Sequence, residues 1–341
     1  MLETIWFVLW GLLWAVYFIL DGFDFGMGTL LPFLAKNNDD KVAIYNAAGP
    51  YWDGNEVWLI TAGGVTFAAF PKAYAVMFSA LYAPLLILLF ALIFRAASFE
   101  FRNKKDCPGW RKFWDVWQFL GNFLPALLLG VAFANLFMGI PVDGDGVYHG
   151  NILKLLNPYG LAGGIFFVLI FCMHGAIWLA LKTTAEMHVR AVIAAHVLWP
   201  LVVAMSLAFL AMTAFYTDLY ANYGEHPTLL IFPLAAVFLL LTVRVMMAGD
   251  NLLGAWFCSA GFIFALTFFG VLGMYPGLVI SSIDPAYSVT AFNGASSPLT
   301  LKIMLGVTLT CVPVVIAYQA WVYYIFARKV SDEGIRHDQQ R

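Results

Sequence analysis

Charged residues are scarce in this 341-residue chain: Asp, Glu, Lys and Arg make up 11% of it, whereas hydrophobic residues make up 62%. A soluble globular domain carries about 25% charged residues. The scarcity therefore excludes a soluble protein, and the mean hydropathy of +0.82 indicates an integral membrane protein. The net charge of −2 gives no reason to expect a nucleic-acid partner.

Cysteine is also rare, with Cys107, Cys172, Cys258 and Cys311 far apart in the sequence. They form no CxxC pair and no CxxCH motif, which excludes the usual zinc sites and a covalently attached c-type haem. The sequence also lacks a Gly-rich phosphate loop and an E-x-x-H metal motif, so ATP-driven chemistry is not expected. Linkers rich in Ser, Gly or Pro are missing too, so we expect residues 1–341 to form a single membrane domain.

The sequence contains several long runs of apolar residues. A helix needs about 20 mainly apolar residues to cross the hydrocarbon core, and only helices or closed barrels satisfy their backbone there. The runs therefore predict an all-α polytopic protein, with two four-helix bundles and one peripheral helix. The nine predicted spans are residues 5–31, 52–70, 74–94, 116–138, 159–181, 191–215, 228–248, 253–274 and 302–326. Polar residues dilute the second run, so an eight-span alternative, with 52–70 re-entrant or on the surface, stays open.

The distribution of Lys and Arg predicts the orientation of the spans, because short cytoplasmic loops are enriched in basic residues. With nine spans and the N-terminus outside, in the periplasm, 15 of the 18 basic residues lie inside and Lys72, Lys154 and Lys302 lie outside. The eight-span alternative places 13 inside and 5 outside. Both arrangements predict a cytoplasmic C-terminal tail.

Two acidic pairs interrupt the apolar runs. Asp21 and Asp24 are three residues apart, as are Asp53 and Glu56, so each pair lies on one face of its helix. A carboxylate at bilayer depth costs roughly 2.5 to 3.5 kcal/mol on insertion scales, so such groups usually line a pathway or a paired site. These pairs can share and pass on a proton, or bind a cation. The structural alternative is a hydrated span end for the first pair and a helix N-terminus for the second.

Histidine offers one candidate haem site, formed by His174 in the fifth predicted span and His196 in the sixth. Haem in a membrane bundle is usually held by imidazoles that face each other from neighbouring helices. Neither residue lies in a ligand motif, so a buried histidine satisfied by hydrogen bonds is the favoured interpretation. Arg95 and Glu100 are interpreted as paired or snorkelling charges where the third span ends.

Several ordered motifs are recognisable: D-G-F-D-F-G-M-G at 21–28, W-D-G-N-E-V-W-L-I-T-A-G-G at 52–64, F-A-A-F-P at 67–71 and L-N-P-Y-G-L at 156–161. Together they resemble subunit II of the cytochrome bd type quinol oxidases, and the similarity runs through essentially the entire chain. The resemblance implies a respiratory complex of the bacterial inner membrane that reduces O2 to water with electrons from quinol and takes protons from the cytoplasm.

The resemblance also implies a division of labour within that complex. Two b-type haems and a d-type haem belong to subunit I, and subunit II packs against subunit I as a heterodimer needed for assembly. Family members can contain a structural quinone and small accessory subunits, and the complex contacts membrane lipid. No metal site and no quinone site can be assigned to positions of this chain.

Two acids and one tryptophan match functional positions of the family. The second Asp of D-G-F-D and the Asp of W-D-G-N, here Asp24 and Asp53, belong to a hydrophilic path that leads protons toward the haems. Asp21 and Glu56 are further candidates for this path, and Glu56 stands where Gln is common in relatives. Trp58 matches a tryptophan near a hydrophobic route for O2.

Two other functions stay open beside this resemblance. A cation-coupled secondary transporter also uses intramembrane carboxylates and helices interrupted by glycine. A stand-alone di-haem cytochrome b would need axial ligands, for which His174 and His196 are the candidates. Copurification with a haem protein would separate the first from an oxidase subunit, and a Soret band from the isolated chain would indicate the second.

Overall fold

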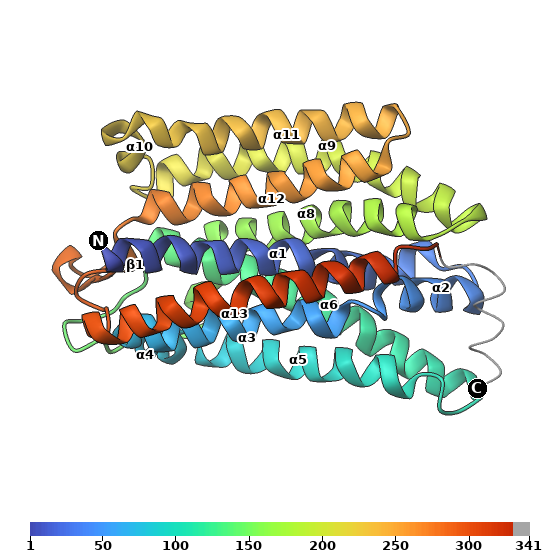
Figure 1. The fold of residues 1–341 in the computed structure, drawn as a ribbon, viewed down its shortest axis with the longest axis horizontal. Coiled ribbons are helices and arrows are strands. Elements are labelled where there is room, and N and C mark those ends of the chain that lie inside the picture. Colours follow the sequence, from blue (N-terminus) through green and yellow to red (C-terminus); the bar gives the residue numbers. More distant parts are fainter. Residues whose placement is uncertain (330–341) are drawn as a thin grey trace.

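The computed structural model describes residues 1–329 and consists almost entirely of helices (Figure 1). The α-helices of this described part are α1 (Leu2–Leu34), α2 (Asn38–Ala48), α3 (Trp52–Ala69), α4 (Pro71–Ala80), α5 (Tyr82–Phe101), α6 (Pro108–Met138), α7 (Ile152–Leu155), α8 (Pro158–Lys182), α9 (Ala185–Tyr216), α10 (Ala221–Glu225), α11 (Ile231–Ala248), α12 (Leu252–Met274) and α13 (Pro298–Ile325). Two short strands, β1 (Gly277–Val279) and β2 (Val289–Thr290), pair antiparallel in one connecting segment. The predicted all-α polytopic class is confirmed.

Eight helices of the described part are long and apolar enough to cross a membrane, and the predicted second span is not among them. That span is α3, whose hydropathy is lowered by Asp53, Asn55 and Glu56. Its 18 residues nevertheless extend for about 27 Å, close to the thickness of the hydrocarbon core, which is about 30 Å. α3 also runs along α1 in the body of the molecule (Figure 1). The structure therefore has eight apolar spans plus α3, and the predicted count of nine is approximate.

The third predicted span has different bounds in the structure. Residues 74–94 were expected to form one helix, but α4 ends before Leu81 and α5 runs from Tyr82 to Phe101. Pro84 lies in the first turn of α5, where its missing N–H costs no intrahelical hydrogen bond. As a result Arg95 lies well inside α5 and not at its end.

The spanning helices pack around α1. α1 packs against α3, α6, α8 and α12, while α5 packs on α6, α9 on α8 and α11 on α12. Gly26 permits close contact of α1 with α8, because a Cβ atom there would lie 1.8 Å from the carbonyl oxygen of Phe171. Gly130 of α6 and Gly163 of α8 meet in the same way, as small residues do at membrane helix interfaces.

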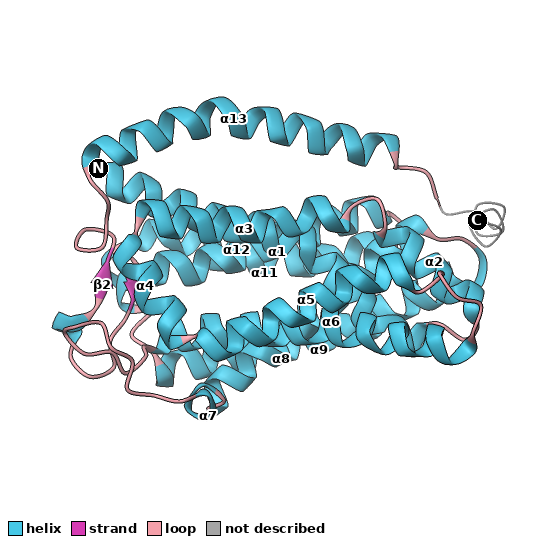
Figure 2. Ribbon diagram, turned by 90° about the horizontal axis from the view of Figure 1, so that it is seen from below, coloured by secondary structure: helices cyan, strands magenta, loops and turns pink. Residues whose placement is uncertain are grey.

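α13 is peripheral, in agreement with the prediction of one peripheral helix, which the sequence does not assign to a particular span. Figure 2 shows α13 along one side of the molecule, apart from most other helices. Leu301 is its one buried residue, and most of its other side chains are apolar. In the bilayer this uncovered surface must contact lipid or another membrane protein.

The two ends of the bundle differ in charge. The N-terminus lies at the end that holds β1, and α2 lies at the opposite end, together with the C-terminal ends of α1, α5, α8 and α13 (Figure 1). Basic residues gather at this second end, hereafter the α2 end: Lys36, Lys41, Arg102, Lys104, Lys105, Arg111, Lys112, Lys182, Arg190, Arg328 and Lys329.

Candidate functional site

The four predicted acids come from two helices that pack side by side. Asp21 and Asp24 of α1 are buried, at 0% and 3% exposure. Asp53 and Glu56 lie in the first turns of α3, where Asp53 is exposed and the Glu56 side chain is 23% exposed. The structure thus brings the carboxylates of Asp21 and Glu56 to Arg95 of α5. It leaves Asp53 at the surface near the start of α3.

Arg95 of α5 is the centre of this buried cluster. Its guanidinium is fully buried and donates two hydrogen bonds to the Asp21 carboxylate, from Nη1 at 2.8 Å and from Nη2 at 3.2 Å. Nη2 also donates to Oε2 of Glu56 at 2.7 Å. Paired N–H donors that match a carboxylate in this way make strong, geometrically specific contacts. The expected pairing of Arg95 with Glu100 is therefore wrong, because Arg95 points into the bundle toward α1 and α3.

Asp24 is bound by an amide. Asn55 of α3 is fully buried, and its Nδ2 donates to Oδ2 of Asp24 at 2.7 Å. The Oδ1 atom of Asn55 accepts from the Tyr323 hydroxyl at 2.9 Å and from Nε2 of Gln319 at 3.2 Å. Asn55 therefore connects Asp24 on α1 to the peripheral helix α13.

Trp58 lies one helical turn further along α3 and contacts the same helix. Its indole is buried, and its Nε1 donates to Oε1 of Gln319 at 2.8 Å. Gln319 therefore joins Trp58 to Asn55, so the residue predicted to line an O2 route shares one hydrogen-bonded chain with Asp24.

Several buried polar atoms of the described residues have no protein partner. Within the cluster these are Oδ1 of Asp24 and Nε of Arg95, and further along the α1 and α6 interface they are Oγ1 of Thr29 and Oδ1 of Asn122. Buried polar groups are normally satisfied by protein or by ordered water. These atoms therefore mark places where water can be held between α1, α5 and α6.

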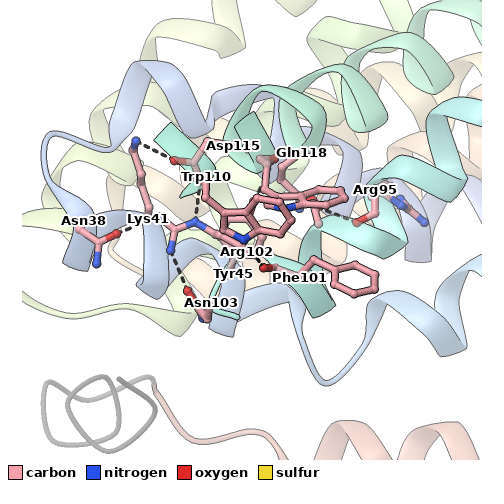
Figure 3. A network of polar contacts seen from close by, with 12 residues as sticks. Asn38, Lys41, Tyr45, Arg95, Phe101, Arg102, Asn103, Trp110, Asp115 and Gln118 are labelled. Carbon is pink, nitrogen blue, oxygen red and sulfur yellow. Dashed lines mark hydrogen bonds and ion pairs between the residues drawn. The ribbon is translucent and has the colours of Figure 1, made fainter. Parts of the chain in front are cut away.

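A second polar network lies at the α2 end, between α2, the end of α5 and the start of α6 (Figure 3). Asp115 accepts from Nζ of Lys41 at 2.8 Å and from Nε of Arg102 at 2.6 Å. The Arg102 guanidinium also donates to Asn38 at 2.9 Å and lies over the Tyr45 ring, 5.1 Å from its centroid. Burial raises the pKa of the Tyr45 hydroxyl, and the nearby Asp115 raises it further. Arg102 and Asp115, the central pair of this network, are buried although both are charged.

Ser98 and Gln118 lie between the two networks. The Ser98 hydroxyl is 2.6 Å from the backbone carbonyl oxygen of Arg95 and also contacts Oε1 of Gln118. The backbone carbonyl oxygen of Gln118 accepts a hydrogen bond from Nδ2 of Asn122 at 2.6 Å. Figure 3 shows the labelled residues in sequence from Lys41 through Asp115 and Gln118 toward Arg95. Polar side chains therefore continue from the α2 end into the acid cluster.

His174 and His196 have protein partners in place of a haem. Both ring nitrogens of His174 have protein partners, the Ser259 hydroxyl at 2.6 Å and the Ile19 carbonyl oxygen at 3.1 Å. His196 instead contacts the Arg244 guanidinium through Nδ1. The favoured interpretation of His174 as a satisfied buried histidine is confirmed. In the part of the chain that the structure describes, no group of three or more His, Cys, Asp or Glu residues could hold a metal ion. The hydrogen bonds of His174 occupy both nitrogens that an axial haem ligand would use.

Comparison with known proteins gives this geometry a context. A family model described as cytochrome bd terminal oxidase subunit II matches residues 2–326. The chain belongs to this family. It is 38% identical over 331 residues to cytochrome bd ubiquinol oxidase subunit 2 of Bacillus subtilis (strain 168), covering 97% of each chain. It is 33% identical over 369 residues to cytochrome bd-I ubiquinol oxidase subunit 2 of Escherichia coli (strain K12), covering 99% of this chain and 97% of the other.

The fold is also similar to that of a solved oxidase. The structure of bd oxidase from Geobacillus thermodenitrificans matches with a TM-score of 0.77 and 14% sequence identity, over 95% of this chain and 98% of the other. Family membership and the apolar helices identify a multi-pass bacterial membrane protein, subunit II of a terminal oxidase in respiration. The alternative of a cation-coupled transporter has no support from these comparisons.

Asn55, Arg95 and the network around Arg102 and Asp115 were not predicted as site residues. A signal for Asn55 was present, since a neutral amide lies between two acids in an apolar run. Arg95 offered a weaker signal, because a basic residue at an expected span end has an ordinary explanation.

Proposed function

We propose that this chain is the subunit of a quinol:O2 oxidoreductase that binds no haem itself, scaffolds subunit I and supplies protons to the site of O2 reduction. The relatives from B. subtilis and E. coli are named as ubiquinol oxidase subunits, which supports this activity for the complex. The occupied ring nitrogens of His174 support the placement of the two b-type haems and the d-type haem in the partner subunit.

The observation that carries the proton path is the charge balance of the buried cluster. The carboxyl groups of Asp21 and Glu56 contact a single guanidinium, that of Arg95, and the buried Asp24, three residues from Asp21 on α1, is bound by the neutral Asn55. Several ionised carboxylates with one buried cation leave an excess of negative charge, and a charge without a partner is costly in a low-dielectric interior. A proton shared within the cluster reduces this excess. The cluster is therefore suited to accept and release a proton.

The proposed path leads from the α2 end to this cluster. Protons enter beside the exposed Asp53 and through the network of Lys41, Asp115 and Arg102. They continue past Gln118 and Ser98 toward the cluster. Proton transfer needs hydrogen-bond reach or a bridging water, and the unpartnered buried atoms along α1 and α6 provide positions for such water.

We assign the α2 end to the cytoplasm and the N-terminus to the periplasm. The basic residues gathered at the α2 end support this orientation, because short cytoplasmic loops are enriched in Lys and Arg. The orientation gives the proton path its source, since the side chains that begin it face the cytoplasm.

An O2 route along α3 is the second part of the proposal. Trp58 presents a buried aromatic surface between α3 and α13, and Gln319 holds its indole in place. An apolar wall of this kind suits passage of a small uncharged molecule.

The proton path is tested with purified complexes that carry Asp24→Asn or Asp53→Asn. We expect quinol oxidase turnover to fall at least about tenfold, because positioned proton-transfer groups typically contribute factors of 10² or more. The haem absorption spectrum should stay unchanged, which shows that the complex has assembled. Asp145→Asn, an exposed acid in the loop at the opposite end, is the matched control and should retain full turnover. Full turnover in both path variants would remove the relay role.

A further inference from the structure

A cavity of about 280 Å³ opens at the α2 end. It lies where the turn between α2 and α3 meets the end of α8 and the segment that follows α13. Its lining includes Tyr51, Lys182, Phe326, Arg328 and Lys329. None of these lining residues carries a carboxylate, although three of them are basic.

Lys182 is a buried cation with neutral partners. The residue is 5% exposed, and its amine donates to the Tyr51 hydroxyl at 2.6 Å and to the Phe326 carbonyl oxygen at 2.5 Å. The amine also lies 4.9 Å from the centroid of the Tyr51 ring and 5.0 Å from that of the Trp178 ring. These contacts orient the cation but do not neutralise it, and a buried charge is costly unless it is paired.

Arg328 and Lys329 increase the positive charge of the same cavity. Both side chains are exposed, and the structure records no carboxylate partner for either one among the described residues. We propose that this cavity binds the phosphate group of an acidic phospholipid, with Lys182 at its base and Arg328 and Lys329 at its rim. Basic cavities between membrane helices are suited to such head groups.

The position of the cavity favours a lipid over free phosphate. It lies at the end of the spanning helices, where lipid head groups are found, and Tyr51 and Trp178 are residues typical of that level. The adjacent end of α13 presents uncovered apolar side chains, with Trp321 at 58% and Tyr324 at 81% exposure. Acyl chains could lie along this surface while the phosphate group occupies the cavity.

Lys182 also has a structural role, so it is unsuitable as the test position. Its contact with the Phe326 carbonyl oxygen holds the end of α13 against α8, and a cation there interacts favourably with the helix dipole. Loss of lipid binding in a Lys182 variant could thus arise from a displaced α13. Arg328 and Lys329 are exposed and follow the helix, so substituting them leaves this contact in place.

The test measures lipid binding by the purified, delipidated oxidase complex in native mass spectrometry. The parent complex should bind phosphatidylglycerol in preference to phosphatidylcholine. The double variant R328Q/K329Q should bind it about 30-fold more weakly, since each basic residue near an anionic lipid surface contributes about 1 kcal/mol, or roughly fivefold. K104Q/K105Q removes two exposed basic residues of the loop between α5 and α6, outside the cavity lining, and should bind like the parent.

Inorganic phosphate distinguishes the two sources of the anion. If millimolar phosphate does not compete with phosphatidylglycerol, the site recognises the lipid, and if phosphate competes and binding depends on Arg328 and Lys329, the site recognises the phosphate group alone. Either result supports an anion site. Equal phosphatidylglycerol binding by the parent complex and R328Q/K329Q, or no preference over phosphatidylcholine, would overturn the proposal.

Discussion

Replacement of Arg95 by Gln is the most direct test of how the buried cluster is stabilised. The substitution removes the two hydrogen bonds to Asp21 and the one to Glu56, and it leaves the Asp21 carboxylate without a cation at 0% exposure. Breaking a buried ion pair by removing one partner costs about 3–5 kcal/mol, because the remaining charge stays buried. We therefore expect Arg95→Gln to destabilise the subunit by an amount in this range.

Substitution of Glu56, the second acid that Arg95 binds, should destabilise the subunit much less than Arg95→Gln. Glu56 is 23% exposed, and in Glu56→Gln the guanidinium of Arg95 keeps its two bonds to Asp21. The Gln side chain can still accept a hydrogen bond, so we expect a loss of at most about 1 kcal/mol. A surface pair provides the matched arginine control: Arg111 lies 3.0 Å from Asp106, whose side chain is 91% exposed. Arg111→Gln should also cost at most about 1 kcal/mol.

The double variant Asp21→Asn/Arg95→Gln separates the loss of the ion pair between these two residues from the effect that each substitution has by itself. It removes both charges, so it should be less destabilised than the sum of the two single variants by about 0.5–3 kcal/mol, the range found for residues in contact. The assay compares thermal unfolding midpoints of purified complexes at one heating rate, because large membrane complexes often unfold irreversibly. Additive losses, or a loss in Arg95→Gln no larger than in Arg111→Gln, would refute the reasoning.

Two further predictions concern helix contact and the O2 route. Gly26→Ala should disrupt the contact of α1 with α8 and cost at least about 1–3 kcal/mol, because its Cβ would lie 1.8 Å from the Phe171 carbonyl oxygen. Gly63→Ala, with no atom within 4 Å of its Cβ, is the control for the same thermal assay and should be neutral or stabilising. Trp58→Ala should change the apparent KM for O2 while Trp58→Phe, which keeps an aromatic wall, changes it less. Equal KM values in all three forms would count against the route.

The importance of the acids of α1 could be predicted from the sequence, because the free-energy cost of inserting a carboxylate into the membrane depends only on the residues around it in the chain. Asp21 and Asp24 lie in the middle of an apolar run, and insertion cost alone singles them out as functional or paired groups. Their spacing of three also placed them correctly on one side of the helix. Their burial at 0% and 3% exposure agrees with a role inside the bundle.

The partner of Asp21 could not be predicted, because it lies 74 residues away in the sequence. Hydropathy placed the end of the third span at residue 94, which made Arg95 a boundary residue. The break at Leu81 moves the helix toward the C-terminus, and Pro84 in the first turn of α5 is a sequence signal for this start that hydropathy alone does not use. An error in the bounds of one helix therefore turned a central residue into an apparent surface charge.

The acids of α3 show a different limit. Asp53 and Glu56 share a helical face by spacing, yet Asp53 is exposed and Glu56 reaches Arg95. Between them Asn55 is fully buried against Asp24. The direction in which α3 faces α1 decides which of these side chains enters the cluster, and successive helical positions differ by about 100°. That direction is set by tertiary packing, so the sequence predicted the segment but not the individual contacts.

The arrangement of charge argues for function over stability. A buried ion pair is often no more stabilising than apolar side chains of the same volume, so stability alone does not explain why Asp21 and Arg95 occupy the centre of an apolar bundle. Asp24 strengthens this argument, because its neutral partner Asn55 leaves one carboxylate oxygen without a protein contact. A cluster built for stability would pair every charge, whereas a cluster that transfers protons needs a group whose charge can change. In the proposed path, Arg95 keeps the site polar in both states, and Asp24 provides the carboxyl group that gains and loses the proton.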